Sequence, residues 1–327
     1  MSAQKSWLFL WLALAIEAPV LAGDAHASSH YPARPIRMIV PVSAGGGLDA
    51  TSRAIAQRLT QTWGQQVVVD NRTGASGVIA FDMAIKAMPD GYTMLMISAD
   101  HVINSVPSAK RPYDISRDVT AVSQATALSY LVYANPSVPI TTFRDLLAQG
   151  RAQPGKLNYG TPGNGSLQHL GWEVLGQISG ARFSHVPYKG GAPAIVATIA
   201  GEVQVGFITL TSARPHLQAG RARALAVTSR ERMRAMPDLP TVSEAGVPGY
   251  ELNQYYGAVI AARTPPAIIR TLSSGIAAAI KAPDVAQRFE ADGWRLVGST
   301  PEEFRAVIQA DLDRWTRVVR DIGLALN

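Results

Sequence analysis

The segment IRMIVPVSAGGGLDATSRAIAQRL, residues 36–59, passes from an apolar run through three glycines into a helical pattern. The run at 36–40 is typical of a buried strand, and Ile55, Leu59 and Trp63 then fall on one face of a helix. This strand, glycine turn and helix predict the first unit of an α/β fold.

Similar patterns alternate along the rest of the chain. The expected strands are 67–69, 92–97, 131–134, 157–160, 185–188, 203–208, 224–228 and 255–262. The expected helices are 78–88, 142–151, 166–179 and 192–200, followed by three more, the last of which opens with a capping box from Thr300 to Glu303. We therefore expect an α/β protein with mainly parallel sheets flanked by helices. The pattern restarts near residue 130, which predicts two domains.

The glycine turn also resembles a dinucleotide-binding fingerprint, because residues 45–50 fit G-x-G-x-x-A and Asp70 closes the next strand. Against this interpretation, residues 41–44 widen the loop between the strand and the first glycine. Asp49 also adds a carboxylate where a pyrophosphate would lie, an unfavourable contact between like charges. We therefore expect no cofactor, and interpret Asp49 as the N-cap of a helix beginning near Ala50 or as a group that binds donors at a ligand's edge.

The order of strand, glycine turn and helix recurs in NYGTPGNGSLQHLGWEVLG, residues 158–176, so Gly45 and Gly163 occupy equivalent places in two α/β units. Free N–H groups at a helix N-terminus carry partial positive charge, and a turn with little side-chain bulk leaves them open to an anion. The pair predicts a cleft that holds an acid from both sides. For either turn alone, glycine is also explained by a tight strand-to-helix connection.

The first residues have the layout of a secretory signal. Lys5 precedes an apolar run at 7–16, and the sequence Ala-His-Ala ending at Ala27 follows. A membrane anchor would need roughly 20 apolar residues, whereas Glu17 and Asp24 interrupt this segment. We expect a periplasmic protein that is cleaved after Ala27.

The composition narrows the functional classes. The chain has no cysteine, which removes disulfides, thiol catalysis and thiolate metal sites. Its formal net charge of +6 favours an anionic ligand only weakly, because the basic residues are spread along the chain. No aromatic residues interleave with them as a single-strand nucleic-acid groove requires, so we expect no nucleic-acid partner.

No motif indicates catalysis. The segments GASGV (74–78) and GNGSL (163–167) miss the spacing of a nucleophile elbow, and no H-E-x-x-H is present. A hydrolase that uses Ser166 and His169 is an alternative, but no acidic residue stands at a position that would indicate the third member of a catalytic triad. We expect a protein that is not an enzyme and has neither a metal nor a cofactor.

Seven segments carry a family resemblance: YPARPIRMIVPVSAGGGLDATSRAIAQRL, GQQVVVDNRTGASGVIA, MPDGYTML, GTPGNGSLQHLGWEVL, HVPYKGGAPAIVATIAGEVQVGF, RALAVTSRERMRAMPDLPTVSEAGVPGY and YYGAVIAARTPP. In this order they resemble the signatures of the Bug family of extracytoplasmic solute receptors, the binding components of tripartite tricarboxylate transporters. The resemblance implies a two-lobed, type II periplasmic-binding-protein (Venus flytrap) fold, with lobe 1 at 28–129 and 254–327 and lobe 2 at 130–253. It also implies small carboxylate ligands. We expect a monomer that meets the transporter's membrane subunits or, alternatively, a sensor kinase's outer domain.

The resemblance also implies which residues bind the ligand, with the backbone N–H groups of the first loop binding one carboxylate. These residues lie in the two glycine loops, after two further strands and near the second chain crossing. They are Ser43, Ala44, Gly45, Gly46, Ser98, Ala99, Thr161, Pro162, Gly163, Asn164, Gly165, Ser166, Tyr188, Lys189, Tyr255 and Tyr256. For Lys189, pairing with the acid and plain exposure to solvent are equally good interpretations.

The chain departs from the family pattern at one place. Many relatives carry an aspartate after the strand that matches GEVQVGF, whereas this chain has Thr209 near that position. Such an aspartate can recognise an amino group, so its absence makes acidic amino acids less suitable ligands. We therefore expect a simple dicarboxylate or an aromatic carboxylate.

Overall fold

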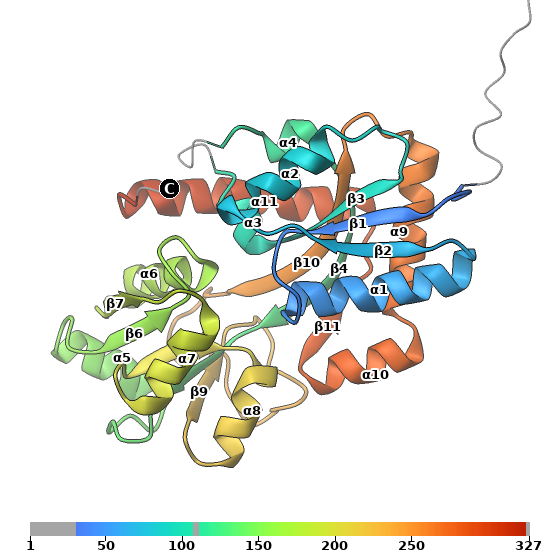
Figure 1. Ribbon diagram of the computed structural model, residues 1–327. Coiled ribbons are helices and arrows are strands. Elements are labelled where there is room, and N and C mark those ends of the chain that lie inside the picture. The colour runs from blue at the N-terminus through green and yellow to red at the C-terminus, as the bar shows by residue number, and fades with distance from the viewer. Residues whose placement is uncertain (1–30, 107–110, 325–327) are drawn as a thin grey trace, which may run out of the picture.

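The computed structural model describes residues 31–106 and 111–324, which form two α/β lobes (Figure 1). Lobe 1 is built on a six-stranded sheet and lobe 2 on a five-stranded sheet, so the expected two-lobed α/β fold is confirmed. The expected leader and its cleavage site after Ala27 lie outside the described residues. Within the described ranges, no helix has both the length and the apolar character needed to cross a membrane.

The sheet of lobe 1 has the strand order β11-β4-β10-β3-β1-β2. Its strands are β1 (Ile36–Val40), β2 (Val67–Asn71), β3 (Thr93–Ser98), β4 (Val119–Ser129), β10 (Asn253–Ala261) and β11 (Trp294–Leu296). The helices of this lobe are α1 (Gly47–Trp63), α2 (Val78–Ile85), α3 (Ala99–Ile103), α4 (Ile115–Asp118), α9 (Pro266–Ile280), α10 (Pro283–Ala291) and α11 (Pro301–Asp321), with a short 3-10 turn η1 (Ala75–Gly77) before α2.

Alternation along β1 explains why helices cover both faces of this sheet. Met38 shares a buried apolar cluster with Ile55 of α1, and α9 and α10 contribute to the same cluster. The next residue, Ile39, belongs to the cluster on the other face, with Phe81 of α2 and Phe304 of α11. Successive strand residues point to opposite faces, so an apolar run without alternation requires a core on each side.

The sheet of lobe 2 has the order β7-β6-β8-β5-β9. Its strands are β5 (Leu131–Ala134), β6 (Asn158–Thr161), β7 (Ser184–Pro187), β8 (Val205–Ile208) and β9 (Arg223–Val227). Its helices are α5 (Phe143–Ala152), α6 (Leu167–Ser179), α7 (Gly191–Ala200) and α8 (Leu210–Gln218), of which α7 and α8 lie in front of the sheet in Figure 1.

Two chain crossings, from β4 to β5 and from β9 to β10, join the lobes and are tied together at Thr228. The Thr228 hydroxyl accepts the Tyr130 N–H (2.8 Å) and donates to the Leu252 carbonyl (2.7 Å). Backbone bonds from Thr228 N to Tyr130 O and from Leu252 N to Thr228 O, both 2.9 Å, complete the tie. One buried threonine therefore fixes the spacing of the two hinge segments.

The expected strands and helices are present, with ends shifted by a few residues, but the expectation of mainly parallel sheets needs correction. Strand β10 runs antiparallel to β3 and β4, and β5 runs antiparallel to β8 and β9. These are the strands at the two crossings, where the chain passes between the lobes and returns, so both sheets are mixed.

Strand β4 is the longest element that the sequence patterns did not predict. Its sequence, VTAVSQATALS, mixes small and polar residues, yet nearly all of it is buried. The polar groups find partners far along the chain, since the Ser123 hydroxyl donates to Ser299 O (2.8 Å) and Gln124 N donates to Ser299 Oγ (2.9 Å). Tertiary hydrogen bonds thus permit a buried strand where local hydropathy gives no signal.

Candidate ligand-binding site

The candidate site lies where strand ends of the two lobes lead into helices. In lobe 1, β1 and β3 are adjacent parallel strands that lead into α1 and α3. In lobe 2, the parallel strands β6, β7 and β8 lead into α6, α7 and α8. The loop between β1 and α1 reaches from lobe 1 toward lobe 2 in Figure 1. Ligands of open α/β sheets bind outside the carboxyl ends of such strands.

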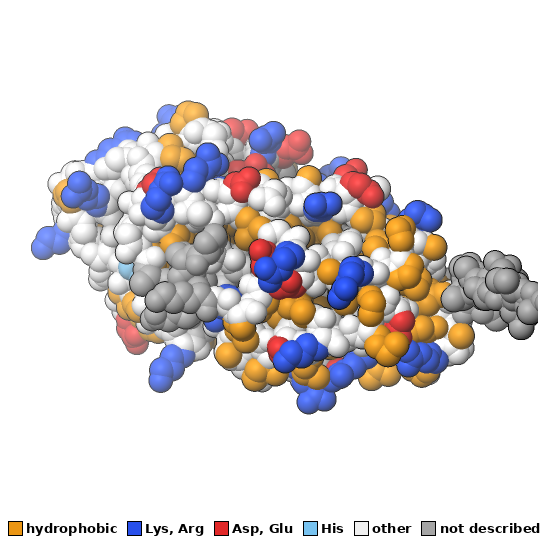
Figure 2. Space-filling view, turned by 90° about the horizontal axis from the view of Figure 1, so that it is seen from above, with side chains coloured by type: hydrophobic (Ala, Val, Ile, Leu, Met, Phe, Trp, Pro, Cys, Tyr) orange, Lys and Arg blue, Asp and Glu red, His pale blue; other side chains and the backbone are white. Residues whose placement is uncertain are grey.

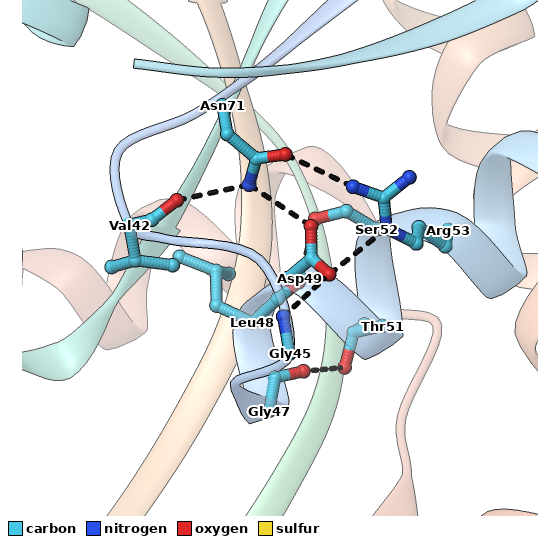
Figure 3. Close-up of polar contacts among 9 residues, drawn as sticks. All are labelled: Val42, Gly45, Gly47, Leu48, Asp49, Thr51, Ser52, Arg53 and Asn71. Atoms are coloured by element: carbon cyan, nitrogen blue, oxygen red, sulfur yellow. Dashed lines mark hydrogen bonds and ion pairs between the residues drawn. The ribbon is translucent and has the colours of Figure 1, made fainter. Parts of the chain in front are cut away.

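The first glycine loop is held from behind by Asp49, as Figure 3 shows. The Asp49 carboxylate accepts hydrogen bonds from Gly45 N (3.0 Å), Arg53 Nε (2.9 Å) and Asn71 Nδ2 (2.9 Å). Asn71 also donates to Val42 O (2.9 Å), which ties the loop to the end of β2. Burial alone would raise the pKa of Asp49, but the bonds from Arg53, Gly45 and Asn71 outweigh it and lower the pKa. The carboxylate is therefore ionised and fully engaged.

The interpretation of Asp49 as an N-cap is wrong. Helix α1 begins at Gly47 and its N-cap is Gly46, so Asp49 is the third helical residue and bonds back to Gly45. The helix starts at Gly47, earlier than expected, because the glycines there have no Cβ to crowd the turn. The local apolar pattern could not reveal this start. Asp49 is 3% exposed, so its contacts are with the loop's own backbone and with its neighbours.

The N-terminus of α1 has open backbone donors. Residues 43–46 are exposed, and the N-cap Gly46 offers no side chain to bond the first helical N–H groups. A Cβ at Gly46 would have no atom within 4 Å, whereas one at Gly47 would lie 2.7 Å from the Tyr256 hydroxyl and 3.0 Å from the Trp294 ring. Gly47, which the sequence analysis did not select, therefore permits close approach of the loop to an aromatic wall.

That wall consists of Tyr256 and Trp294. Their ring centroids lie 5.4 Å apart, and Trp294 packs edge to face against Phe289 of α10 at 4.9 Å. Burial, together with the negative charge of Asp100, raises the pKa of Tyr256, so its hydroxyl stays neutral. Trp294 was missed because it lies on a three-residue strand far from the glycine loops in sequence.

The second glycine loop is bonded largely within itself. Gly163 N donates to Thr161 Oγ1 (3.3 Å) and Gly165 N donates to His169 Nδ1 (3.1 Å). The Ser166 hydroxyl donates to Gly163 O (2.8 Å) and, as the N-cap of α6, accepts His169 N (3.3 Å). The loop's amides are therefore mostly occupied, and the exposed Asn164 contributes a free-standing polar side chain at its tip.

Two stacked histidines support this loop from below. The rings of His169 and His185 lie 3.8 Å apart at 11°, and His185 Nε2 lies 2.6 Å from Thr161 Oγ1. Burial lowers the pKa of His169, and burial together with neighbouring His169 lowers that of His185 to about 4. Both rings are therefore neutral at pH 7. Because Ser166 Oγ bonds a carbonyl and not the His169 ring, the pair lacks the nucleophile-to-base contact that a hydrolase needs.

The lobes meet at the start of α6 through Asp100. Its Oδ1 accepts the Leu167 N–H (3.0 Å) and its Oδ2 accepts Gln254 Nε2 (2.6 Å). Gln254 lies on the hinge strand β10, and its Oε1 accepts Ala99 N at 3.0 Å. One carboxylate of lobe 1 thus bonds both the hinge strand and the first helical amide of α6 in lobe 2.

The remaining predicted residues are distributed around these loops. Ser98 and Ala99 are buried at the end of β3, where Ser98 Oγ lies 2.7 Å from His101 Nδ1. Tyr188 is partly buried, which raises the pKa of its hydroxyl with help from Glu202, and the next residue, Lys189, is exposed.

Two further predicted residues have structural contacts. Thr209 is the N-cap of α8 and accepts Ser212 N. Tyr255, which points to the opposite face from its neighbour Tyr256, packs edge to face on Phe304 in the core. The structure therefore does not bring Tyr255 together with the loops. In the part of the chain that the structure describes, no cluster of side chains is suited to a metal ion.

Comparisons with known proteins show the family and the fold of the chain. Residues 51–324 match the family described as "Tripartite tricarboxylate transporter family receptor". The chain is 35% identical to protein BugT of Bordetella pertussis over 316 residues, 95% of this chain and 94% of BugT. Among solved structures, it resembles Rpa4515 of R. palustris with adipate, at 33% identity and a TM-score of 0.80, covering 90% of this chain and 99% of that one. It also resembles MatC of Rhodopseudomonas palustris with bound malate, at 26% identity and a TM-score of 0.75, covering 88% and 100%.

Proposed function

Because the chain belongs to the receptor family of tripartite tricarboxylate transporters, a family of periplasmic solute-binding proteins, we propose that it captures a small carboxylate between its lobes. The observation that carries the proposal is the uncapped N-terminus of α1 beside the exposed loop 43–46. Gly45 N is already bonded to Asp49, but no side-chain cap bonds the first helical N–H groups, and the helix dipole favours an anion there. The carboxylates bound by Rpa4515 and MatC support the same ligand class.

In this proposal the two lobes have different tasks. The carboxylate binds the first loop, and the body of the ligand lies along Tyr256 and Trp294, which stand over Gly47. Lobe 2 closes on the far end with the loop 161–166, Tyr188, Lys189 and Thr209. A ligand that touches both lobes stabilises the closed state, and a partner can then distinguish a loaded receptor from an empty one.

We propose a simple dicarboxylate or an aromatic carboxylate as ligand, since Thr209 offers no charge for an ammonium group. The receptor is exported, is cleaved after Ala27, and consists of lobe 1 (28–129 and 254–327) and lobe 2 (130–253). It acts as a monomer that delivers its ligand to the membrane subunits of a tripartite tricarboxylate transporter. Basic side chains are spread over the face in Figure 2 and are interspersed with acidic and hydrophobic ones.

Two other functions remain as alternatives. Lobe closure would serve equally well to signal through the outer domain of a sensor kinase, and co-purification with either class of membrane protein distinguishes the two roles. An exported hydrolase using Ser166 is disfavoured by its hydrogen bond to Gly163 O, and the family is one of binding proteins. Incubation with candidate acids, followed by a search for products, tests that alternative.

A thermal-shift screen of the chain from Ser28 tests the main proposal. The probes are mono-, di- and tricarboxylates, aromatic acids, acidic amino acids and NAD. A ligand that binds only the folded state raises the melting temperature by mass action. We expect a shift with one class of carboxylate and none with NAD. A shift with NAD alone would overturn the proposal in favour of a dinucleotide site.

A further inference from the structure

Asp100 places a negative charge between the two glycine loops. Its carboxylate accepts Leu167 N at 3.0 Å, directly after the second loop. It is also close enough to Tyr256 to raise the pKa of that hydroxyl, which stands over Gly47 of the first loop. A ligand that extends from the first loop toward the second therefore passes near this carboxylate.

The contact from Asp100 is not needed to cap α6. That helix already has its own N-cap, since Ser166 accepts His169 N. The Asp100 bond instead comes from the other lobe, 67 residues earlier in the sequence. It occupies a helix N-terminal amide, which is the kind of donor that a second ligand carboxylate would require.

The neighbours of Asp100 do not neutralise it. Its other oxygen accepts the uncharged amide Gln254 Nε2 at 2.6 Å. Tyr130 and Tyr256 also lie nearby, and burial together with the charge of Asp100 raises the pKa of both phenols. Among the salt bridges of the described residues, none involves Asp100.

We infer that Asp100 is a specificity-determining residue, which restricts the ligand to one carboxylate, bound at α1, with no negative charge at the end that faces lobe 2. This inference rests on the proposed function. Of the ligands proposed there, it excludes the dicarboxylates and keeps aromatic and other monocarboxylates. The far end can be apolar, or can donate a hydrogen bond to the remaining lone pairs of Asp100. A second carboxylate would meet a like charge and find the α6 amide occupied.

The experiment compares ligands that differ in one carboxylate, namely benzoate against terephthalate and hexanoate against adipate. Calorimetry measures their affinities for the wild type and for Asp100→Asn, which keeps an oxygen acceptor for Leu167 N but removes the charge. Asp82→Asn is the matched control, because it removes a charge from the exposed surface of α2 in the same lobe. Thermal melting checks that each variant is folded.

We expect the wild type to prefer the monocarboxylate of each pair. Asp100→Asn should shift the ratio of the two affinities toward the dicarboxylate by about tenfold, because it removes a screened charge repulsion that acts over several ångströms. Asp82→Asn should leave this ratio unchanged. A wild type that prefers the dicarboxylates, or an unchanged ratio in folded Asp100→Asn, overturns the inference while the proposed function stands. If Asp100→Asn does not fold, the wild-type preference alone decides. Binding of neither class by the wild type contradicts the proposed function itself.

Discussion

The two glycine loops look alike in sequence but differ in what they leave open. In the loop before α1, Asp49 takes the amide of Gly45, but the helix has no side-chain cap and residues 43–46 are exposed. In the loop before α6, the amides of Gly163 and Gly165 are bonded internally, Ser166 caps the helix, and Asp100 takes the amide of Leu167. A glycine-rich turn before a helix is therefore not sufficient to define an anion site. Whether such a turn can bind an anion depends on which of its backbone N–H groups are free.

This difference assigns separate tasks to the lobes. The first loop can provide charge recognition through its backbone, which depends little on side-chain identity. The second can provide shape and side-chain contacts, because its backbone is already committed to the histidine stack beneath it. Substitutions in the two loops should therefore have unequal effects on binding.

The largest effect is expected from Gly46→Asp. The position has φ −82° and open space around a Cβ, so the side chain fits without strain. Aspartate is a favourable N-cap, and here it would bond the same N–H groups that the ligand needs and repel its carboxylate. We expect at least about a 100-fold loss of affinity, equivalent to two charge-assisted hydrogen bonds, with an undiminished melting temperature.

Asn164→Asp is the control for this comparison, because it places the same charge at the exposed tip of the second loop. We expect its affinity for a monocarboxylate, measured by calorimetry, to fall by clearly less than that of Gly46→Asp, since the backbone amides there are occupied and the Asn164 side chain is exposed. Unchanged affinity in Gly46→Asp would refute the assignment of the anion loop. Equal losses in both variants would remove the proposed difference between the loops.

Gly47→Ala should have a smaller effect, which separates shape from charge within the first loop. Its methyl group would lie 2.7 Å from the Tyr256 hydroxyl and 3.0 Å from Trp294, so the aromatic wall must move. We expect about a tenfold loss of affinity, in line with the cost of a misfitted packed contact. Gly46→Ala is the matched control, because its methyl group meets no atom within 4 Å. A loss in Gly46→Ala as large as in Gly47→Ala would contradict the close-approach argument.

The sequence predicted the position of both loops because local patterns determine them. An apolar run, glycines and a helical face are encoded within 24 residues at 36–59. It did not predict the difference between the loops, because that depends on distant partners. Asp100 lies 67 residues from Leu167, and Trp294 reaches the first loop from a strand with only three residues.

The same reasoning explains Asp49 and Tyr255. Asp49 was correctly placed beside the loop. Because the helix starts at Gly47, the Asp49 carboxylate accepts the Gly45 N–H from within the first helical turn and is not the N-cap. Tyr255 and Tyr256 were selected together, yet alternation along β10 sends only Tyr256 toward the loop and buries Tyr255 against Phe304. Period-two alternation, applied to the aromatic pair, would have separated them.

The smallest expected effect concerns the stacked rings of His169 and His185, which form hydrogen bonds with the second loop. The pKa of His185 is lowered to about 4, first by burial and then by His169, from an ordinary value near 6.5. The unfolded chain therefore binds the proton more readily. The stabilising contribution of neutral His185 is complete above about pH 6.5 and is lost as the pH falls toward 4. His185→Gln should reduce the loss of unfolding free energy between pH 7 and 5 by about 1 kcal/mol, after a discount for partial exposure.

Denaturant unfolding at both pH values measures this difference, with His216→Gln as the control for loss of a histidine from the same lobe. His101, whose pKa burial also lowers to about 4, is retained in every variant, so its contribution cancels in the comparison. His185 faces His169, Tyr159 and the Thr161 hydroxyl, and Glu173 lies 3.8 Å from His169 on α6. A pH dependence in His185→Gln equal to that of the wild type would mean that the stack does not hold the second loop through its neutral state. The contrast with the first loop would then rest on Asp100 and Ser166 alone.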